Sequence, residues 1–219
     1  MRRAFLAITL GGLLVALLVS VLVRPSLAFT LGVDGMRVAA DLPPGGRVCE
    51  RPVAMPPDGE FDRVVLTLET AAPPGPPLQV EIEDGRSGEV LATGRLAGRY
   101  ADGERAVRVG RVDTARPLSV CITNDGAGRV GLLGGRGDPI RPPYAQLDGR
   151  RLRDDLDLAF EREPRTLLSL APAIAERAAL FRPDWVGPWT YGALVVILAI
   201  AVPALLALSL AGLRDDPRQ

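Results

Sequence analysis

Histidine and lysine are both absent from the 219-residue chain. Without histidine, the chain lacks the commonest general base, the commonest metal ligand and every Ser-His or Cys-His nucleophile pair. The 26 basic residues are therefore all Arg, and 26 acidic residues balance them. Because Arg and acidic residues alternate and neither sign dominates, the charge pattern argues against a nucleic-acid partner. The composition predicts a protein that is not an enzyme, with no cofactor and no catalytic or metal-binding residues.

Cysteine is nearly absent too, since Cys49 and Cys121 are the only two. An even pair in an oxidising compartment predicts one disulfide, with two buried free thiols as the alternative. In the run from Leu118 to Ile122 the cysteine points away from the alternating apolar side chains. We therefore expect the bridge on an outer face of the fold rather than through its core.

Charge is missing from two long apolar runs, residues 4–23 and 190–213. Each is about as long as the roughly 20 residues that a helix needs to cross a bilayer. Short basic tails, residues 1–3 and 214–219, flank the two runs and favour cytoplasmic termini. The sequence therefore predicts two transmembrane helices in the cell membrane, with lipid as a partner and the middle of the chain outside.

The two predicted spans carry further signals. Trp185, Trp189 and Tyr191 cluster at the outer entrance of the second span, where amphipathic rings settle at the headgroup level. Small residues recur at intervals of four, a spacing that lets helices approach closely in lipid. These candidate contact residues are Gly12, Ala16 and Ser20 in the first span and Ala199, Ala207 and Ala211 in the second.

The first apolar run has a second interpretation as a cleaved signal peptide. Ser26-Leu27-Ala28 resembles a small-x-small cleavage site after a basic start and an apolar stretch. The run is, however, longer than the 7 to 15 residues or so of a signal core. An uncleaved signal anchor is therefore the favoured interpretation.

Between the spans, residues 30–163 alternate apolar and polar side chains in short runs, such as 64–69 and 78–83. This period of two, with turn-forming dipeptides between the runs, is typical of antiparallel strands with one wet face. About eight strands spaced by roughly ten residues predict an extracytoplasmic β-sandwich. A jelly-roll-like arrangement is favoured over an immunoglobulin-like one, because both Trp residues lie near the membrane and cannot pack on the cysteines.

The pattern changes to helical spacing after the strands. Residues 164–182 form a predicted amphipathic helix, with Leu167, Leu170 and Ile174 on one side. Such a helix can lie on the outer membrane surface or bind a partner. Packing on the sandwich is the alternative.

Acidic residues offer one route to catalysis. Asp154, Asp155 and Asp157 are the most closely grouped, and a carboxylate pair can hydrolyse glycosidic bonds. A carboxylate-based hydrolase of envelope glycan is therefore one alternative function. The neighbouring Arg residues nevertheless favour a solvated, non-catalytic surface at this run.

Three stretches of the chain resemble a loosely defined group of actinobacterial membrane-anchored β-sandwich envelope proteins. They are residues 47–50 (RVCE), residues 120–124 (VCITN) and the stretch from Leu168 to Trp189. The resemblance implies a companion of cell-envelope glycosyltransferases, with an accessory or polysaccharide-binding role outside the membrane. It supplies no site residues.

Together these features predict a non-enzymatic binding or scaffold protein of the cell envelope, assisting glycan assembly or export. Its expected partners are membrane lipid, an envelope glycosyltransferase or polysaccharide. A structural subunit of a larger membrane complex remains a further alternative.

Overall fold

The computed structural model describes residues 2–56, 58–70, 74–137, 143–179, 187–201 and 203–205. The chain divides into two compact units. One unit is Ser26–Glu163, and the other combines the segments on either side of it in the sequence. Of the residues predicted from the sequence, Trp185, Ala207 and Ala211 lie outside the described part, as does the C-terminal tail.

The flanking unit is helical. It contains α1 (Arg2–Leu22), α2 (Leu167–Ala179) and α3 (Pro188–Val196), which continues into the π-helical turn η1 (Ile197–Ala201). Within the described ranges, Pro188–Leu205 is the one helical stretch long and apolar enough, by length and composition, to cross a membrane. The apolar stretch found in α1, Gly11–Leu22, is shorter, so the first of the two expected spans stays a prediction. Pro203 follows η1 and has no N–H to donate, and a local π turn is a common adjustment to such a proline.

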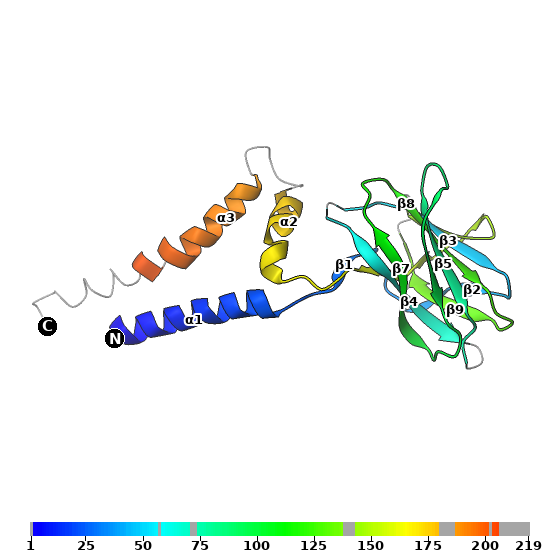
Figure 1. The fold of residues 1–219 in the computed structure, drawn as a ribbon, viewed down its shortest axis with the longest axis horizontal. Coiled ribbons are helices and arrows are strands. Elements are labelled where there is room, and N and C mark those ends of the chain that lie inside the picture. Colours follow the sequence, from blue (N-terminus) through cyan, green and yellow to red (C-terminus); the bar gives the residue numbers. More distant parts are fainter. Residues whose placement is uncertain are drawn as a thin grey trace, which may run out of the picture. The chain divides into compact units, whose positions relative to one another are not determined.

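The expected antiparallel β-sandwich is confirmed, with two sheets facing one another (Figure 1). The seven-stranded sheet contains β1 (Leu27–Thr30), β2 (Arg37–Leu42), β4 (Phe61–Thr70), β7 (Gly103–Val112), β9 (Val130–Gly135), β12 (Asp155–Leu156) and β13 (Leu158–Glu161). The six-stranded sheet contains β3 (Arg47–Val53), β5 (Leu78–Asp84), β6 (Val90–Leu96), β8 (Leu118–Asn124), β10 (Tyr144–Leu147) and β11 (Arg150–Arg151).

The strand order shows how distant segments are brought together. In the six-stranded sheet the order is β11-β10-β3-β8-β5-β6, with every pair antiparallel. In the other sheet, the long strand β4 pairs with β7, and also with β13 and β9. The site described below therefore draws on β3, β5, β8 and β10, which span much of the chain.

Alternate side chains of both sheets fill the core. Val80 and Ile82 of β5 and Val120 and Ile122 of β8 are all fully buried, as period-two alternation requires. Three rings close one part of the core: Phe29 stacks on Phe160 with centroids 4.3 Å apart, and Phe61 meets Phe160 edge-on at 4.9 Å. Aromatic pairs of this geometry contribute beyond their buried area.

The β5–β6 hairpin illustrates how one side chain fixes a turn. Asp84 accepts hydrogen bonds from the backbone N–H groups of Arg86 and Ser87, both at 2.9 Å. These two bonds lower the pKa of Asp84 to about 2, and the Arg116 guanidinium at 3.2 Å adds to the effect. A carboxylate held in this way stays ionised and stabilises the reversal.

The structure contains short strands that alternation alone had not marked. In β3 the inward position between Cys49 and Arg51 is the acidic residue Glu50, and Pro52 follows. In β12 only two residues pair with β9. Such strands lack the regular apolar alternation by which strands are predicted from sequence.

Candidate binding face

The register of the six-stranded sheet brings polar side chains from four strands into one row. Gln146 lies beside Cys49, Cys49 beside Cys121, and Cys121 beside Glu81. The row belongs to the outer face, because the residues that alternate with it, such as Val48 and Ile122, are buried in the core. We call this surface the disulfide face, and define it by Arg47, Cys49, Arg51, Glu81, Glu83, Cys121 and Gln146.

The predicted disulfide between Cys49 and Cys121 is confirmed. It joins directly opposite residues of neighbouring strands, with a Cα–Cα distance of 4.0 Å. The bond lies on the outer face and does not link the two sheets, as the alternation around Cys121 had indicated. Cys121 is nevertheless only 1% exposed, so its outer-face neighbours cover it.

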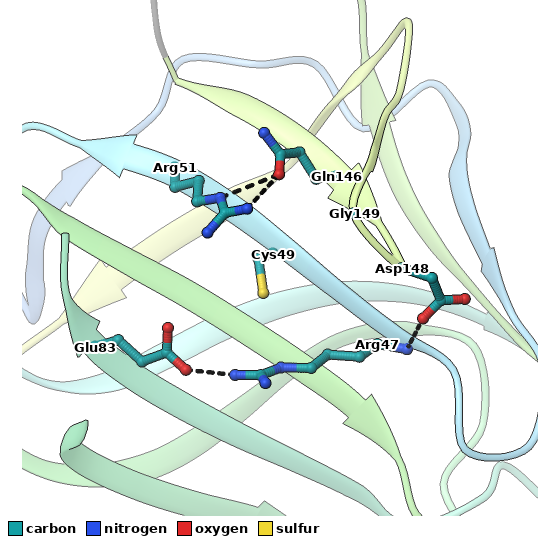
Figure 2. A pocket seen from close by; sticks show the side chains of 7 residues that line it. All are labelled: Arg47, Cys49, Arg51, Glu83, Gln146, Asp148 and Gly149. Atoms are coloured by element: carbon teal, nitrogen blue, oxygen red, sulfur yellow. Dashed lines mark hydrogen bonds and ion pairs between the residues drawn. The ribbon is translucent and has the colours of Figure 1, made fainter. Parts of the chain in front are cut away.

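A cavity of about 240 Å³ opens on the disulfide face. Figure 2 shows its lining residues, which are Arg47, Cys49, Arg51, Glu83, Gln146, Asp148 and Gly149. Every lining residue except Cys49 and Gly149 carries a charge or an amide. The cavity therefore offers hydrogen-bond donors and acceptors and charges of both signs, beside a cysteine that the disulfide holds in place.

Ion pairs hold one side of the cavity. The Arg47 guanidinium donates to Glu81 at 3.0 Å and to Glu83, and the backbone N–H of Arg47 donates to Asp148 at 3.1 Å. Gln79 donates to the second carboxylate oxygen of Glu81 at 2.9 Å. These bonds fix the side chains before any ligand arrives, which lowers the entropy lost on binding.

The opposite side of the cavity is held by a neutral partner. Both the Nε and one terminal nitrogen of Arg51 donate to the Oε1 atom of Gln146, the former at 3.1 Å. Arg51 is exposed. Next to this pair, the Arg151 guanidinium stacks on the Tyr144 ring, 3.5 Å from its centroid, and Tyr144 lies opposite Arg51 in the register.

A second cavity, of about 210 Å³, lies on the seven-stranded sheet. Its lining residues are Val38, Asp41, Glu69, Arg129 and Gly131. Arg129 donates to Asp41 at 2.6 Å, and this carboxylate raises the pKa of Arg129. Among its lining residues the second cavity has neither a side-chain amide nor a neighbouring tyrosine such as those at the first cavity.

The acidic run at residues 154–157 is not uniformly solvated, which corrects the interpretation from sequence. Asp155 is only 6% exposed and accepts from the Ala145 backbone at 3.3 Å, while Asp157 accepts from the Thr67 hydroxyl at 3.0 Å. Burial raises the pKa of Asp155. Strand β12 turns Asp155 inward because its backbone pairs with the Gly135 end of β9, a pairing that local sequence does not reveal.

Glu50 is the buried acid that sequence reasoning missed. It is fully buried, and one of its oxygens accepts from the Leu156 backbone at 3.0 Å while the other has no hydrogen-bond partner. Burial raises the pKa of Glu50 to about 8; the Leu156 bond opposes the shift and the nearby Asp155 adds to it. Glu50 is therefore protonated at neutral pH.

The helical positions predicted from sequence behave individually as follows. Gly12 and Ala16 are exposed, and the Ser20 hydroxyl donates to the Ala16 carbonyl of its own helix at 2.8 Å. Trp189 is exposed, and the Tyr191 hydroxyl donates to the Ala178 carbonyl at 2.8 Å. The helix-contact role of these small residues, Ala199 included, stays a prediction.

One signal in the sequence could have located the disulfide face earlier. Arg47, Cys49 and Arg51 alternate along β3, so they must share the face on which the disulfide lies. Gln146 carries no comparable signal, because it reaches Cys49 only through the pairing of β10 with β3.

No family model and no curated protein matches the chain. Among solved structures, the chain is similar to CsCBM6-3 from Clostridium stercorarium in complex with cellobiose. That match has 16% identity, covers 50% of this chain and 79% of the other, and has a TM-score of 0.31.

Proposed function

We propose that the chain is a membrane-anchored envelope protein whose jelly-roll-like sandwich binds polysaccharide on its disulfide face, outside the cell membrane. The observation that carries the proposal is the cavity lined by Arg47, Arg51, Glu83, Gln146 and Asp148. Sugar hydroxyls donate and accept hydrogen bonds at once. A surface that alternates guanidinium, carboxylate and amide groups in fixed positions suits such a ligand.

The location of the protein is part of the proposal. It is supported by the two charge-free runs, by their basic flanks and by a disulfide, which is typical of oxidising compartments. In this arrangement α1 is an uncleaved signal anchor and both termini are cytoplasmic. Alkylation by a membrane-impermeant maleimide of single cysteines placed at Arg86 and at Arg3 tests it: only the first should react in intact cells.

A binding role is favoured over hydrolysis for a geometric reason. A glycosidase needs a carboxylic acid that touches the substrate, with its partner about 5 to 9 Å away. The acid with the strongest desolvation is Glu50, and its side chain is fully buried. The carboxylates that line the described cavity of the disulfide face, Glu83 and Asp148, are instead engaged with Arg47.

Binding can be tested with the full chain in lipid nanodiscs on an array of bacterial envelope glycans, followed by titration of each retained glycan. Replacing Arg51 and Gln146 by Ala removes one wall of the cavity, and we expect at least a tenfold loss of affinity. Arg129→Ala, in the second cavity, is the matched control and should bind like the wild type. Retention of no glycan, or equal losses in both variants, would refute the proposal.

We also expect a glycosyltransferase of the same membrane as the partner to which bound polysaccharide is passed. Co-purification of a defined envelope glycosyltransferase with the wild-type chain supports this expectation only if added glycan changes the yield. Co-purification that is indifferent to glycan and to the Arg51 and Gln146 substitutions favours the structural-subunit alternative.

A further inference from the structure

Helix α2 has an apolar face that stays exposed. Leu168 and Ile174 are 56% and 54% exposed, although both are large hydrophobic residues. On a helical projection both belong to one continuous apolar arc, while Ser169 and Glu176 lie on the opposite side. The arc comprises Leu167, Leu168, Leu170, Ala171, Ile174, Ala175 and Ala178. It contains no charge, and Leu170 at its edge is buried.

Two hydrogen bonds tie the ends of α2 to the ends of the other helices. At its start, the Leu167 backbone N–H donates to the carbonyl of Val23, directly after α1, at 3.3 Å. At its last turn, the Ala178 carbonyl accepts from the hydroxyl of Tyr191, in the first turn of α3, at 2.8 Å. Both ends of α2 are thus held where a neighbouring helix ends or begins.

If α1 and α3 cross the bilayer, these two hydrogen bonds determine how deep in the membrane α2 lies. The 21 residues of α1 extend about 30 Å, close to the thickness of the hydrocarbon core. Val23 and Tyr191 then lie at the same outer interface, with Trp189 beside them. A helix whose two ends are held at one depth must lie roughly parallel to the membrane plane.

We propose that α2 is an interfacial helix whose face around Leu168 and Ile174 is buried in the outer leaflet of the bilayer. The inference rests on the membrane attachment proposed above. Lipid is the occupant that fits, because the exposed face is apolar, uncharged and continuous with the two spans through the Val23 and Tyr191 bonds. Ser169 and Glu176 then point toward water.

The experiment exploits the disulfide. Because Cys49 and Cys121 are bonded to each other, a cysteine introduced at position 174 is the only reactive thiol. The Ile174→Cys chain is labelled with an environment-sensitive fluorophore in nanodiscs, without reductant, and quenched by lipids that carry a spin label near the headgroup. We expect at least twofold stronger quenching than in the matched Glu176→Cys chain. Leu168→Cys is a second variant expected to behave like Ile174→Cys.

A third label separates the two proposals. Leu194→Cys lies in α3 and should be quenched by lipids spin-labelled deep in the acyl chain. Quenching at position 194 with equal, weak quenching at 174 and 176 overturns the interfacial helix alone. No quenching at position 194 overturns the membrane attachment as well. A blue-shifted but unquenched label at 174 shows that protein, not lipid, covers the face, and it also overturns the inference.

Discussion

The two faces of strand β3 differ in the surroundings of their ionisable side chains. On the outer face, the Arg47 and Arg51 side chains are held by Glu81, Glu83 and Gln146 at partly solvated positions. On the inner face, one residue away, the Glu50 side chain is fully buried, and burial raises its pKa to about 8. Ionisable side chains are therefore held at a solvated surface on one face and become a neutral part of the core on the other.

The contrast between the outer and inner faces of β3 indicates which side chains are able to bind a ligand. Side chains that are already held in position lose little conformational entropy when a ligand binds. A fully buried acid, in contrast, cannot contact a ligand. The sequence does not distinguish the carboxylates that pair with Arg on the solvated face from the carboxyl group that is buried in the core.

The largest effect is expected from the disulfide, which ties the outer face of β3 to β8. Replacing Cys49 and Cys121 by Ala should lower the free energy of unfolding by about 4 kcal/mol, because the bond closes a loop between residues 72 apart. Urea titration of the full chain in nanodiscs, followed by the circular dichroism of the strands, measures the loss. A decrease below about 1 kcal/mol would show that the bond between the two outer-face cysteines contributes little to stability.

The second effect concerns the inner face and depends on pH. The folded-state pKa of Glu50, about 8, exceeds its ordinary value of 4.5, so the folded chain binds more protons between these values. Its stability should therefore fall as pH rises from about 4.5 to 8 and level off above. Asp155 acts electrostatically on Glu50, and Arg151 and Asp154 act in turn on Asp155.

Glu50→Gln removes the titration while keeping an acceptor for the Leu156 N–H. We expect this variant to be more stable than the wild type by about 3 kcal/mol at pH 9, and to lose most of that advantage at pH 4. Denaturation at both pH values checks the difference. A variant that is less stable than the wild type at pH 9 would mean that Glu50 is ionised and paired after all.

The smallest effect is expected at Arg47 on the outer face. Arg47→Gln breaks the pairs with Glu81 and Glu83, yet these groups are partly exposed, so stability should change by less than about 1 kcal/mol. Glycan affinity, in contrast, should fall several-fold, because Glu83 is no longer held at the cavity wall. A loss of several kcal/mol would erase the contrast between the two faces.

Much of the β-sandwich could be predicted from local patterns. Strands β4 and β5 alternate apolar and polar residues so regularly that their inward faces follow from the sequence. The position of the disulfide on an outer face followed from the same alternation around Cys121. β3 was harder, because Glu50 and Pro52 interrupt its pattern.

The candidate site was less predictable, for a physical reason. Its cavity is made where β10 lies beside β3, which brings Gln146 next to Cys49 across almost 100 residues of chain. Pairing over that distance depends on the packing of the whole sandwich, not on the residues near either partner. Asp155 shows the same limit, since its burial depends on pairing with β9.

The antiparallel sandwich and the disulfide could be predicted from the sequence alone, because the alternation of apolar and polar residues and the presence of two cysteines can be read without the fold. The two charge-free runs carry the prediction of a membrane anchor in the same way. Which polar residues share the disulfide face, and which acids are buried, depends on the tertiary structure. Those outcomes depend on strand register, where a shift of one residue exchanges the inner and outer faces.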